Sequence, residues 1–159
     1  MAYIYETKNF LVESFETPHI TRTDGGHIKI LPKVSIKNRT EMSPALAIEF
    51  IRLTMIIGES FEVAMNNRGI KIIRLNYQDM GNWAFKSGKE PIFHMHIYGR
   101  AKDAKYQAYQ EAVNLPDRST GFYKDFEALN EDDIQEIQKQ ISFVLKQEKY
   151  DLKNWGLSF

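Results

Sequence analysis

Hydrophobic residues recur every third or fourth position over one long segment, from Ser43 to about Asn67. Such spacing places them on one face of a helix, as an apolar stripe that packs on a core. Ser43 suits the N-cap, Pro44 suits the first helical position, where no N–H is needed, and Gly69 is placed to end the helix. The pattern predicts a long amphipathic helix whose buried side is Leu46, Phe50, Leu53, Ile57, Phe61 and Ala64.

Shorter apolar runs around this helix predict strands. His27 to Leu31 alternates apolar and polar residues with period two, as a half-buried strand does, and Pro32 ends it. Asp24-Gly25-Gly26 before it is a turn signal, because glycine accepts positive φ at little cost. The other predicted strands are Lys8 to Phe15, Ile70 to Leu75 and Ile92 to Tyr98.

The pattern is weak from Arg100 to Asn130 and then becomes helical again. Asn130 and Asp133 are candidate caps of a second helix, with Glu131, Asp132 and Asp133 complementing its dipole. Its predicted buried side is Ile134, Ile137, Ile141, Val144 and Leu145. Strands grouped with two helices, without regular β-α-β alternation, favour an α+β fold: an antiparallel sheet with a long central helix and a C-terminal helix. We expect a single domain over residues 1–159.

Composition narrows the function classes. The chain has 159 residues, no cysteine, and 21 basic against 21 acidic side chains, for a formal net charge of zero. Disulfides, thiolate metal sites and a cysteine nucleophile are therefore excluded. A balanced charge argues against a dedicated nucleic-acid binder. The N-terminus lacks a signal-peptide pattern and no apolar run approaches ~20 residues, so we expect a cytoplasmic protein without a membrane span.

The four histidines then become the candidate chemistry. In the predicted strand Ile92 to Tyr98, side chains alternate between faces, so His94, His96 and Tyr98 share one side with Ile92. Two imidazoles roughly 7 Å apart along one face could handle one ligand. His27 begins another predicted strand, and His19 follows Pro18 in an irregular stretch.

Two segments resemble the histidine-triad superfamily of nucleotide hydrolases and transferases, whose motif is His-φ-His-φ-His-φ-φ with φ apolar. Residues 92–100 read Ile-Phe-His-Met-His-Ile-Tyr-Gly-Arg, and residues 26–33 read Gly-His-Ile-Lys-Ile-Leu-Pro-Lys, like a second strand of the family. Glu41-Met42-Ser43-Pro44 before a long helix is similar to its continuation. The resemblance covers residues 17–100, whereas the extension 101–159 matches no family pattern.

The register of the motif decides which histidine has which role. In the better register Ile92 replaces the first histidine, His94 is the second and His96 the third, so this is a variant with two histidines. In the other register His94 is the first histidine, His96 the second and Tyr98 the third, but Gly99-Arg100 then arrives too early.

The resemblance implies attack on the α-phosphorus of a nucleotide derivative by His94, through a nucleotidyl-histidine intermediate and without a metal or another cofactor. It also implies that His96 holds phosphate oxygens or the leaving group, and that the protein is a homodimer. The remaining candidate substrate-binding residues are His27, beside the site, His19, as a ribose contact, Lys89, in the Ser87-Gly88-Lys89 loop, and Tyr98, which with His27 could handle the leaving group.

Two other hypotheses stay open. Loss of the first histidine is compatible with a nucleotide-binding module that has the fold but no turnover. Gly88 followed by five residues and then His94-Met95-His96 also reproduces the opening of the cupin metal-binding pattern, although the glutamate that cupins place four or five residues later is Arg100 or Ala101 here.

Overall fold

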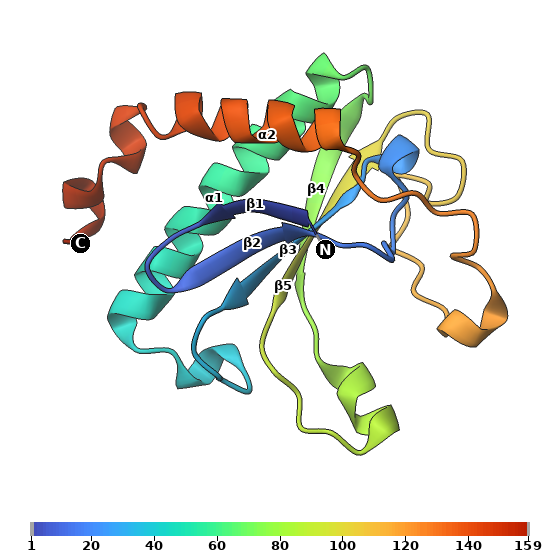
Figure 1. Cartoon of the computed structure of the whole chain (residues 1–159), viewed down its shortest axis with the longest axis horizontal. Helices are drawn as coiled ribbons and strands as arrows, with labels where there is room; N and C mark the ends of the chain where they lie inside the picture. The colour runs from blue at the N-terminus through green and yellow to red at the C-terminus, as the bar shows by residue number, and fades with distance from the viewer. Residues whose placement is uncertain (1, 159) are drawn as a thin grey trace.

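The computed structural model describes residues 2–158 and has an open five-stranded antiparallel sheet in the order β1-β2-β3-β5-β4. Two α-helices and several short 3-10 helices complete the fold (Figure 1). This confirms the predicted α+β class. The strands are β1 (Ala2–Glu6), β2 (Phe10–Ser14), β3 (His27–Pro32), β4 (Ile72–Asp79) and β5 (Met95–Ala101), and the helices are α1 (Pro44–Asn67) and α2 (Glu131–Val144).

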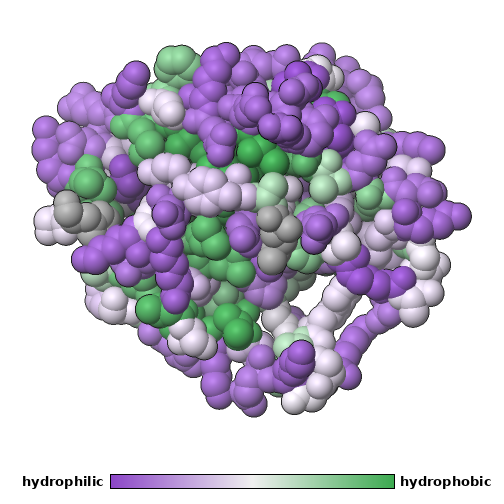
Figure 2. Space-filling model, viewed as in Figure 1, coloured by the Kyte–Doolittle hydropathy of each residue, from purple (hydrophilic) through white to green (hydrophobic). Residues whose placement is uncertain are grey.

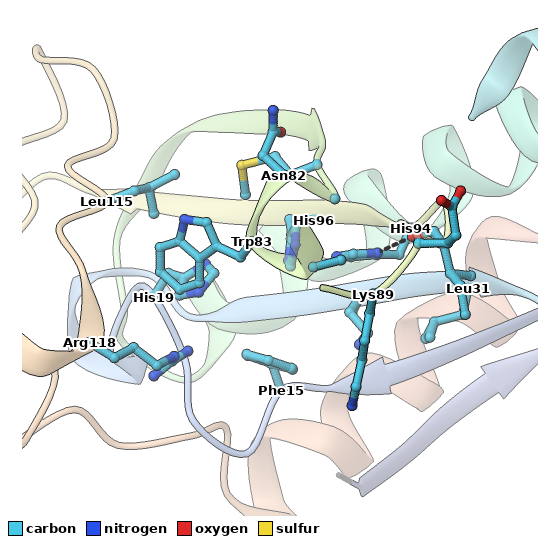
Figure 3. Close-up of a pocket in the computed structure, with 16 residues that line it drawn as sticks. Phe15, His19, Leu31, Asn82, Trp83, Lys89, His94, His96, Leu115 and Arg118 are labelled. Atoms are coloured by element: carbon cyan, nitrogen blue, oxygen red, sulfur yellow. Dashed lines mark hydrogen bonds between the residues drawn. The ribbon is translucent and has the colours of Figure 1, made fainter. Parts of the chain in front are cut away.

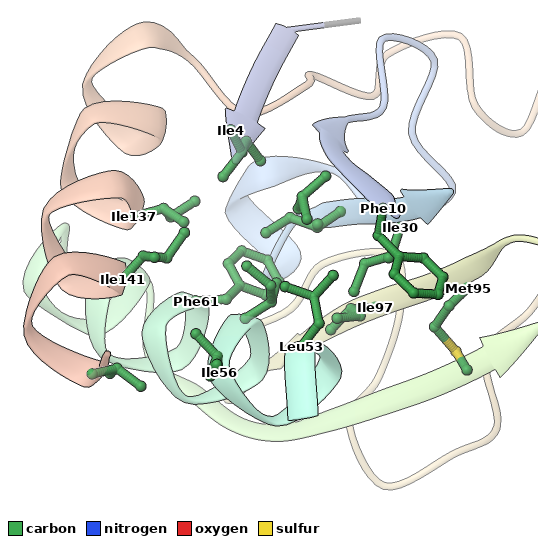
Figure 4. Packing of buried hydrophobic residues seen from close by; sticks show 14 of the residues in the cluster. Ile4, Phe10, Ile30, Leu53, Ile56, Phe61, Met95, Ile97, Ile137 and Ile141 are labelled. Atoms are coloured by element: carbon green, nitrogen blue, oxygen red, sulfur yellow. The ribbon is translucent and has the colours of Figure 1, made fainter. Parts of the chain in front are cut away.

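The two faces of the sheet have different chemistry because side chains alternate along each strand. On one face, Ile28 and Ile30 of β3 and Ile97 of β5 are fully buried in the hydrophobic core with α1 (Figure 4). The intervening residues project to the other face, where His27 is the register partner of Tyr98 and Lys29 that of His96. Residues on the core face stabilise the fold, and residues on the histidine face are available for a functional site.

Helix α1 begins and ends as the sequence predicted. The Ser43 hydroxyl accepts a hydrogen bond from the Leu46 N–H at 3.3 Å, and Pro44 occupies the first turn. At the other end, Gly69 follows the C-cap Arg68 with φ of +83°, a conformation in which a side chain is strained. Its predicted apolar stripe packs on the sheet, with Leu53, Ile57 and Phe61 fully buried.

Helix α2 starts with a capping box between Asn130 and Asp133, again as predicted. Asp133 does more than complement the dipole: it is buried and accepts hydrogen bonds from Arg22 at 2.7 and 2.8 Å and from Arg68 at 3.2 Å. Burial raises the pKa of Asp133, but the hydrogen bonds from Arg22, the Asn130 N–H and Arg68 together with the charge of Arg22 outweigh it, so the net pKa is lowered. This contact ties α2 to the turn before β3.

The strands differ from the predictions in three places. β1 was not predicted; it is five residues long and buries only Ile4, so it carries little periodic signal. β4 runs to Asp79, beyond the predicted end at Leu75, because its partner β5 continues to pair with it. β5 begins at Met95 instead of Ile92, so His94 lies just before the strand.

A close backbone approach fixes the turn before β3 against β5. Gly25 has φ of +128°, and a Cβ built there would lie 2.2 Å from the Gly99 carbonyl oxygen. A Cβ at Gly99 would in turn lie 2.3 Å from the Gly25 carbonyl oxygen. Only glycine fits at both positions, and the contact lies next to the paired residues His27 and Tyr98.

Hydrophilic residues cover the upper part of the surface in Figure 2, where α2 lies in the same view, and hydrophobic residues remain visible below it. None of the helices within residues 2–158 has both the length and the apolar character needed to cross a lipid bilayer.

Candidate functional site

A cavity of about 580 Å³ opens on the histidine face of the sheet (Figure 3). Its walls come from the sheet, from the loop 80–90 that connects β4 to β5, and from the segment before α2. It is lined by Phe15, His19, Lys29, Leu31, Met80, Gly81, Asn82, Trp83, Ala84, Lys89, Glu90, Ile92, His94, His96, Leu115 and Arg118.

His94 is held by the extended segment that leads into β5. The buried Phe93 packs on Phe50 with ring centroids 5.3 Å apart, and its N–H donates to the Ile36 carbonyl at 2.8 Å. With Phe93 in the core, its neighbours Ile92 and His94 line the cavity. The His94 Nδ1 lies 2.8 Å from the carbonyl oxygen of Ile92, the contact dashed in Figure 3.

This contact fixes the proton on the His94 ring. A carbonyl oxygen only accepts, so Nδ1 carries the hydrogen and donates it. In the neutral ring Nε2 then keeps its lone pair. Burial lowers the pKa of His94, the hydrogen bond to Ile92 opposes this, and the charge of Lys29 adds to the lowering. His94 is therefore neutral at pH 7 and presents a nucleophilic nitrogen.

A second chain of hydrogen bonds fixes His27 and His96. The backbone N–H of His19 can only donate, and it lies 3.2 Å from His27 Nδ1, which must accept. Neutral His27 then carries its proton on Nε2, which lies 2.7 Å from His96 Nδ1. His96 Nδ1 accepts this hydrogen bond, so neutral His96 carries its own proton on Nε2 and is a donor there.

Both rings are kept neutral by their surroundings. Burial lowers the pKa of His96 to about 2, with further lowering from the charges of His94, His19 and Lys29. Burial also lowers the pKa of His27 well below its usual value, and His96 and His19 add to the effect. The cavity wall therefore combines a lone pair on His94 with an N–H donor on His96, from rings whose centroids are 4.7 Å apart.

The structure brings the four histidines together, but it divides the candidate residues into two layers. His19, His94, His96 and Lys89 line the cavity, whereas His27 and Tyr98 are buried behind it. The Tyr98 hydroxyl lies 2.8 Å from His19 Nδ1. Burial raises the pKa of Tyr98, so its hydroxyl stays protonated. His27 and Tyr98 are thus placed to position other histidines and not to contact a ligand in the cavity.

His19 is itself more constrained than a ribose contact on a loop would be. It is buried, its ring stacks on His27 with centroids 5.1 Å apart, and Trp83 meets its ring edge-on at 5.5 Å. Burial is the main reason why the pKa of His19 is lowered to about 4, and the charges of Arg118, His94 and Lys29 contribute further lowering.

The Ser87-Gly88-Lys89 loop does not offer the backbone N–H groups of Gly88 and Lys89 to a ligand. The Gly88 N–H donates to the Phe85 carbonyl at 3.2 Å, and the Lys89 N–H donates to the Ala84 carbonyl at 3.0 Å. Both backbone donors are used to end the 3-10 helix Asn82–Ser87. Only the exposed side chain of Lys89 is available to the cavity.

Several cavity residues were missed by the sequence reasoning. Trp83 lies outside the predicted strands and helices; it is 38% exposed and forms the wall over His19. Arg118 comes from the segment without a periodic pattern, and its guanidinium lies 5.0 Å from the Tyr123 ring. The one available signal was Lys29, which shares the polar face of the alternating strand with His27.

Polar anchors position the segment that supplies Leu115 and Arg118. The buried Asp24 carboxylate accepts the backbone N–H groups of residues 105, 106 and 107 at 2.7–2.8 Å. The Gln107 side chain donates to the His19 and Asn114 carbonyls. Arg100, buried on β5, donates to the carbonyls of Ala108 and Glu111, so it supports this segment from outside the cavity.

Three of the histidines also satisfy a loose geometric test for a metal site. His19, His27 and His96 each offer one ligand atom, and these atoms lie within 4.8 Å of one another. However, His27 Nε2 and His96 Nδ1 are 2.7 Å apart, closer than the ~3.3 Å between nitrogens around tetrahedral zinc with bonds of ~2.0 Å. The group fits a hydrogen-bonded chain better than a zinc site.

The cupin hypothesis is wrong, because an open sheet with a long helix is not a cupin barrel. It also required His94 beside His96 as a ligand, whereas His94 lies outside the compact histidine group.

An open antiparallel sheet that carries a long helix on one face and clustered histidines on the other defines a fold class, and comparison with solved structures identifies it as the histidine-triad fold. The sequence matches no protein-family model and no curated protein.

A zinc-bound histidine triad family protein from Mycobacterium smegmatis is similar with a TM-score of 0.57 and 19% identity, over 89% of this chain and 84% of that one. A Hit-like protein of Bartonella henselae, described as involved in cell-cycle regulation, has a TM-score of 0.56 and 14% identity, over 87% and 85%. A hypothetical histidine triad nucleotide-binding protein of Sulfolobus tokodaii has a TM-score of 0.54 and 17% identity, over 92% and 85%. Sequence identities this low show a shared fold only. The activity has to be inferred from the residues of the site.

Proposed function

We propose that the protein is a nucleotide hydrolase or nucleotidyl transferase that acts at the α-phosphate of a nucleotide derivative. The observation that carries the proposal is the hydrogen bond from His94 Nδ1 to the Ile92 carbonyl, which leaves the lone pair on Nε2 of a residue that lines the cavity. The structural neighbours are histidine-triad proteins, and one of them is described as nucleotide-binding. This similarity supports the same assignment.

In the first step, the His94 Nε2 lone pair attacks the α-phosphorus, a P–N bond forms, and the bond to the leaving group breaks. The ring becomes cationic, and its Nδ1–H continues to donate to the Ile92 carbonyl, a dipole that favours the positive charge. The Nε2–H of His96 donates to a phosphoryl oxygen on the reacting group. Water or another acceptor then attacks phosphorus, and the P–N electron pair returns to His94.

Ile92 at the first triad position is compatible with this mechanism. The group that orients the nucleophile is the backbone carbonyl of residue 92, which isoleucine supplies as well as histidine does. Ile92 is 55% exposed, and its side chain cannot donate or accept a proton. We therefore expect slow turnover of substrates whose leaving group needs protonation.

The remaining cavity residues would bind the substrate. His19 and Trp83 form one wall, and Lys89 offers a cation at the opposite part of the opening. The cavity volume of about 580 Å³ is typical of sites that bind small ligands. His27 and Tyr98 act as positioning residues, since they hydrogen-bond to His96 and His19 from behind.

The test is incubation with adenosine phosphoramidate, dinucleoside polyphosphates and nucleotidylated amines, followed by chromatography of released mononucleotide. We expect release by the wild-type protein and none by His94→Ala at unchanged melting temperature. Intact-protein mass spectrometry, done after rapid mixing and without acid, should show one nucleotidyl group on the wild type only. Full activity of His94→Ala would refute the assignment. Ile92→Ala, which keeps the carbonyl, is the matched control.

A second candidate is a nucleotide-binding module without turnover, and the observation that favours it is Ile92 itself. Under this alternative, AMP binds in isothermal titration calorimetry, but no substrate in the panel releases product and no nucleotidyl-protein forms. The same assays therefore discriminate the two candidates.

We also propose a homodimer formed through β4 and α1. β4 lies at the edge of the sheet, where its outer backbone groups are not paired with another described strand. Its Ile73 and Tyr77 are exposed, as are Ile51 and Met55 on α1. Sedimentation equilibrium should give twice the chain mass, and Met55→Glu should give a monomer; a wild-type monomer at all concentrations would refute this proposal.

A further inference from the structure

One side of the cavity is bounded by two segments that are distant in the sequence. The 3-10 helix Asn82–Ser87 (η3) supplies Trp83 to the lining, and the segment before α2 supplies Leu115 and Arg118. Figure 3 shows the Trp83 ring over His19, with Leu115 and Arg118 on the side away from His96. The contacts between these two segments therefore decide whether this side of the cavity is open or closed.

Three contacts join η3 to the segment before α2. The Lys86 ammonium forms an ion pair with the Asp117 carboxylate. The same ammonium lies 5.2 Å from the centre of the Trp83 ring, and the Arg118 Cζ lies 5.9 Å from it. One aromatic ring thus contacts a cation from each of the two segments. We call Lys86, Trp83, Asp117 and Arg118 the latch.

The segment before α2 is the fixed side of the latch. A guanidinium nitrogen of Arg118 donates to the Thr17 carbonyl at 2.7 Å, and the Arg118 Cζ lies 5.0 Å from the centre of the Tyr123 ring. The Tyr123 hydroxyl in turn donates to the Pro116 carbonyl at 3.1 Å. With the buried anchors described above, these contacts hold the segment against the sheet.

Helix η3 has the properties of a unit that moves as a whole. None of its six residues, all of which the structure describes, is buried. It carries local hydrogen bonds, from the Ala84 N–H to the Gly81 carbonyl and from the Ser87 hydroxyl to the Ala84 carbonyl, both at 3.0 Å. The two ends of the loop meet, since a Cβ at Gly81 would lie 2.9 Å from the Pro91 Cβ. A surface loop with closed ends and its own hydrogen bonds moves without disturbing the strands that it connects.

The polar ties between this loop and the rest of the chain are exposed ion pairs. The side chains of Lys86 and Asp117 are 57% and 46% exposed, and Glu90 pairs with Lys37 at 2.8 Å in a similarly exposed position. The hydrogen bond from Lys86 is the main reason why the pKa of Asp117 lies well below its usual value. The carboxylate is therefore ionised at neutral pH and the pair is formed, but exposed pairs contribute little free energy.

We propose that η3 is a lid over the cavity, held closed by the latch, which opens to admit and to release a ligand. An exposed ion pair shifts an equilibrium only about 1.5- to 5-fold, so the latch favours the closed form without preventing opening. In the closed form Trp83 covers His19 and keeps water from this side of the cavity. Opening of the lid is a step of ligand access, separate from the chemistry proposed for His94.

A cross-link tests whether the lid must open. The chain has no cysteine, so maleimides react only with an introduced pair, Lys86→Cys with Asp117→Cys. A bismaleimide joins the two positions, and N-ethylmaleimide, which caps both without joining them, gives the matched control. Stopped-flow fluorescence should show that AMP associates with the cross-linked form at least about 10-fold more slowly than with the capped form. Equal association rates would overturn the lid.

A second measurement needs no nucleotide. With Trp155→Phe, Trp83 is the only tryptophan, and acrylamide quenching reports how far its ring is exposed. Because Trp83 is 38% exposed when the lid is closed, the quenching constant of the cross-linked form should be about 2-fold below that of the capped form. If quenching differs in this way while AMP neither binds nor is released from any substrate, the lid stands and the proposed function fails. Equal quenching overturns the lid, whatever the turnover.

A charge variant tests the latch without altering the neighbours of Trp83 on η3. Asp117→Asn removes the charge but keeps the side-chain oxygen that accepts from the Ser119 N–H. In the Trp155→Phe background it should raise the quenching constant by up to about 2-fold. Lys139→Met, which breaks the equally exposed ion pair with Glu136 on α2, is the control and should leave quenching unchanged. An unchanged constant in Asp117→Asn, or the same rise in both variants, would overturn the latch.

Discussion

The buried histidines predict a steep loss of stability in mild acid. The pKa of His19 is lowered to about 4 and that of His96 to about 2, both mainly by burial, and that of His27 is lowered well below its usual value. Each therefore stays neutral in the folded protein at pH 5, whereas in the unfolded chain each binds a proton below a pKa of ~6.5. The unfolded state takes up more protons, so stability is complete above pH ~6.5 and falls as the pH decreases below it.

The magnitude follows from the linkage relation. At pH 5, a histidine with an unfolded pKa of ~6.5 that stays neutral when folded costs about 2 kcal/mol of unfolding free energy. Three such groups, His19, His27 and His96, remove about 6 kcal/mol between pH 7 and pH 5, a large part of the ~5–15 kcal/mol typical of a domain. Near pH 5 the slope should approach ~4 kcal/mol per pH unit, which corresponds to about three protons.

Urea unfolding followed by circular dichroism at half-unit steps from pH 7.5 to 5, at constant ionic strength, measures this slope. His19→Gln, whose amide can still meet the Tyr98 hydroxyl, should lower it by about one proton. His94→Ala should change it less, because His94 is only half-buried. A stability that is flat between pH 7 and 5 would refute the neutral chain and indicate a proton shared between His27 and His96 in the folded state.

Three further variants test the supports of the site. Gly99→Ala should destabilise the protein by more than ~3 kcal/mol in thermal unfolding, because the new Cβ would lie 2.3 Å from the Gly25 carbonyl oxygen; an unchanged melting temperature would disprove this close approach. Asp133→Asn should cost ~3 kcal/mol in urea unfolding, since it leaves the Arg22 guanidinium without its carboxylate, and a loss below ~1 kcal/mol would contradict that reasoning. Ile92→Ala should keep product release within about 3-fold of wild type, because the carbonyl that orients the nucleophile remains; a 100-fold loss would show that the side chain matters.

Local sequence signals were sufficient for much of the fold. Ser43 and Pro44 fixed the start of α1 because capping depends on the residues of one turn. The alternation in residues 27–31 placed the buried isoleucines and His27 on opposite faces of β3, and the same logic placed His96 beside it. These features are encoded within a few neighbouring positions.

The rest of the site depends on contacts between distant segments. His94 was expected within a strand, but Phe93 pairs with Ile36 instead of with β3 or β4, so β5 starts one residue after His94. Trp83 and Arg118 lie in segments without periodicity, and their positions are set by partners such as the Thr17 carbonyl, 101 residues from Arg118. Spacing along the chain contains no information about such pairs.

In the proposed mechanism, the change at the first triad position affects the leaving group and not the nucleophile. Residue 92 orients the nucleophile through its backbone, so its side chain is free of that task, and isoleucine there removes only a group that could act on a leaving group by proton transfer. A phosphate leaving group has no need of a proton at this step, whereas an amine leaving group does. An Ile92→His variant should accordingly improve turnover of adenosine phosphoramidate more than that of diadenosine triphosphate, and equal gains on the two substrates would show that residue 92 does not act on the leaving group.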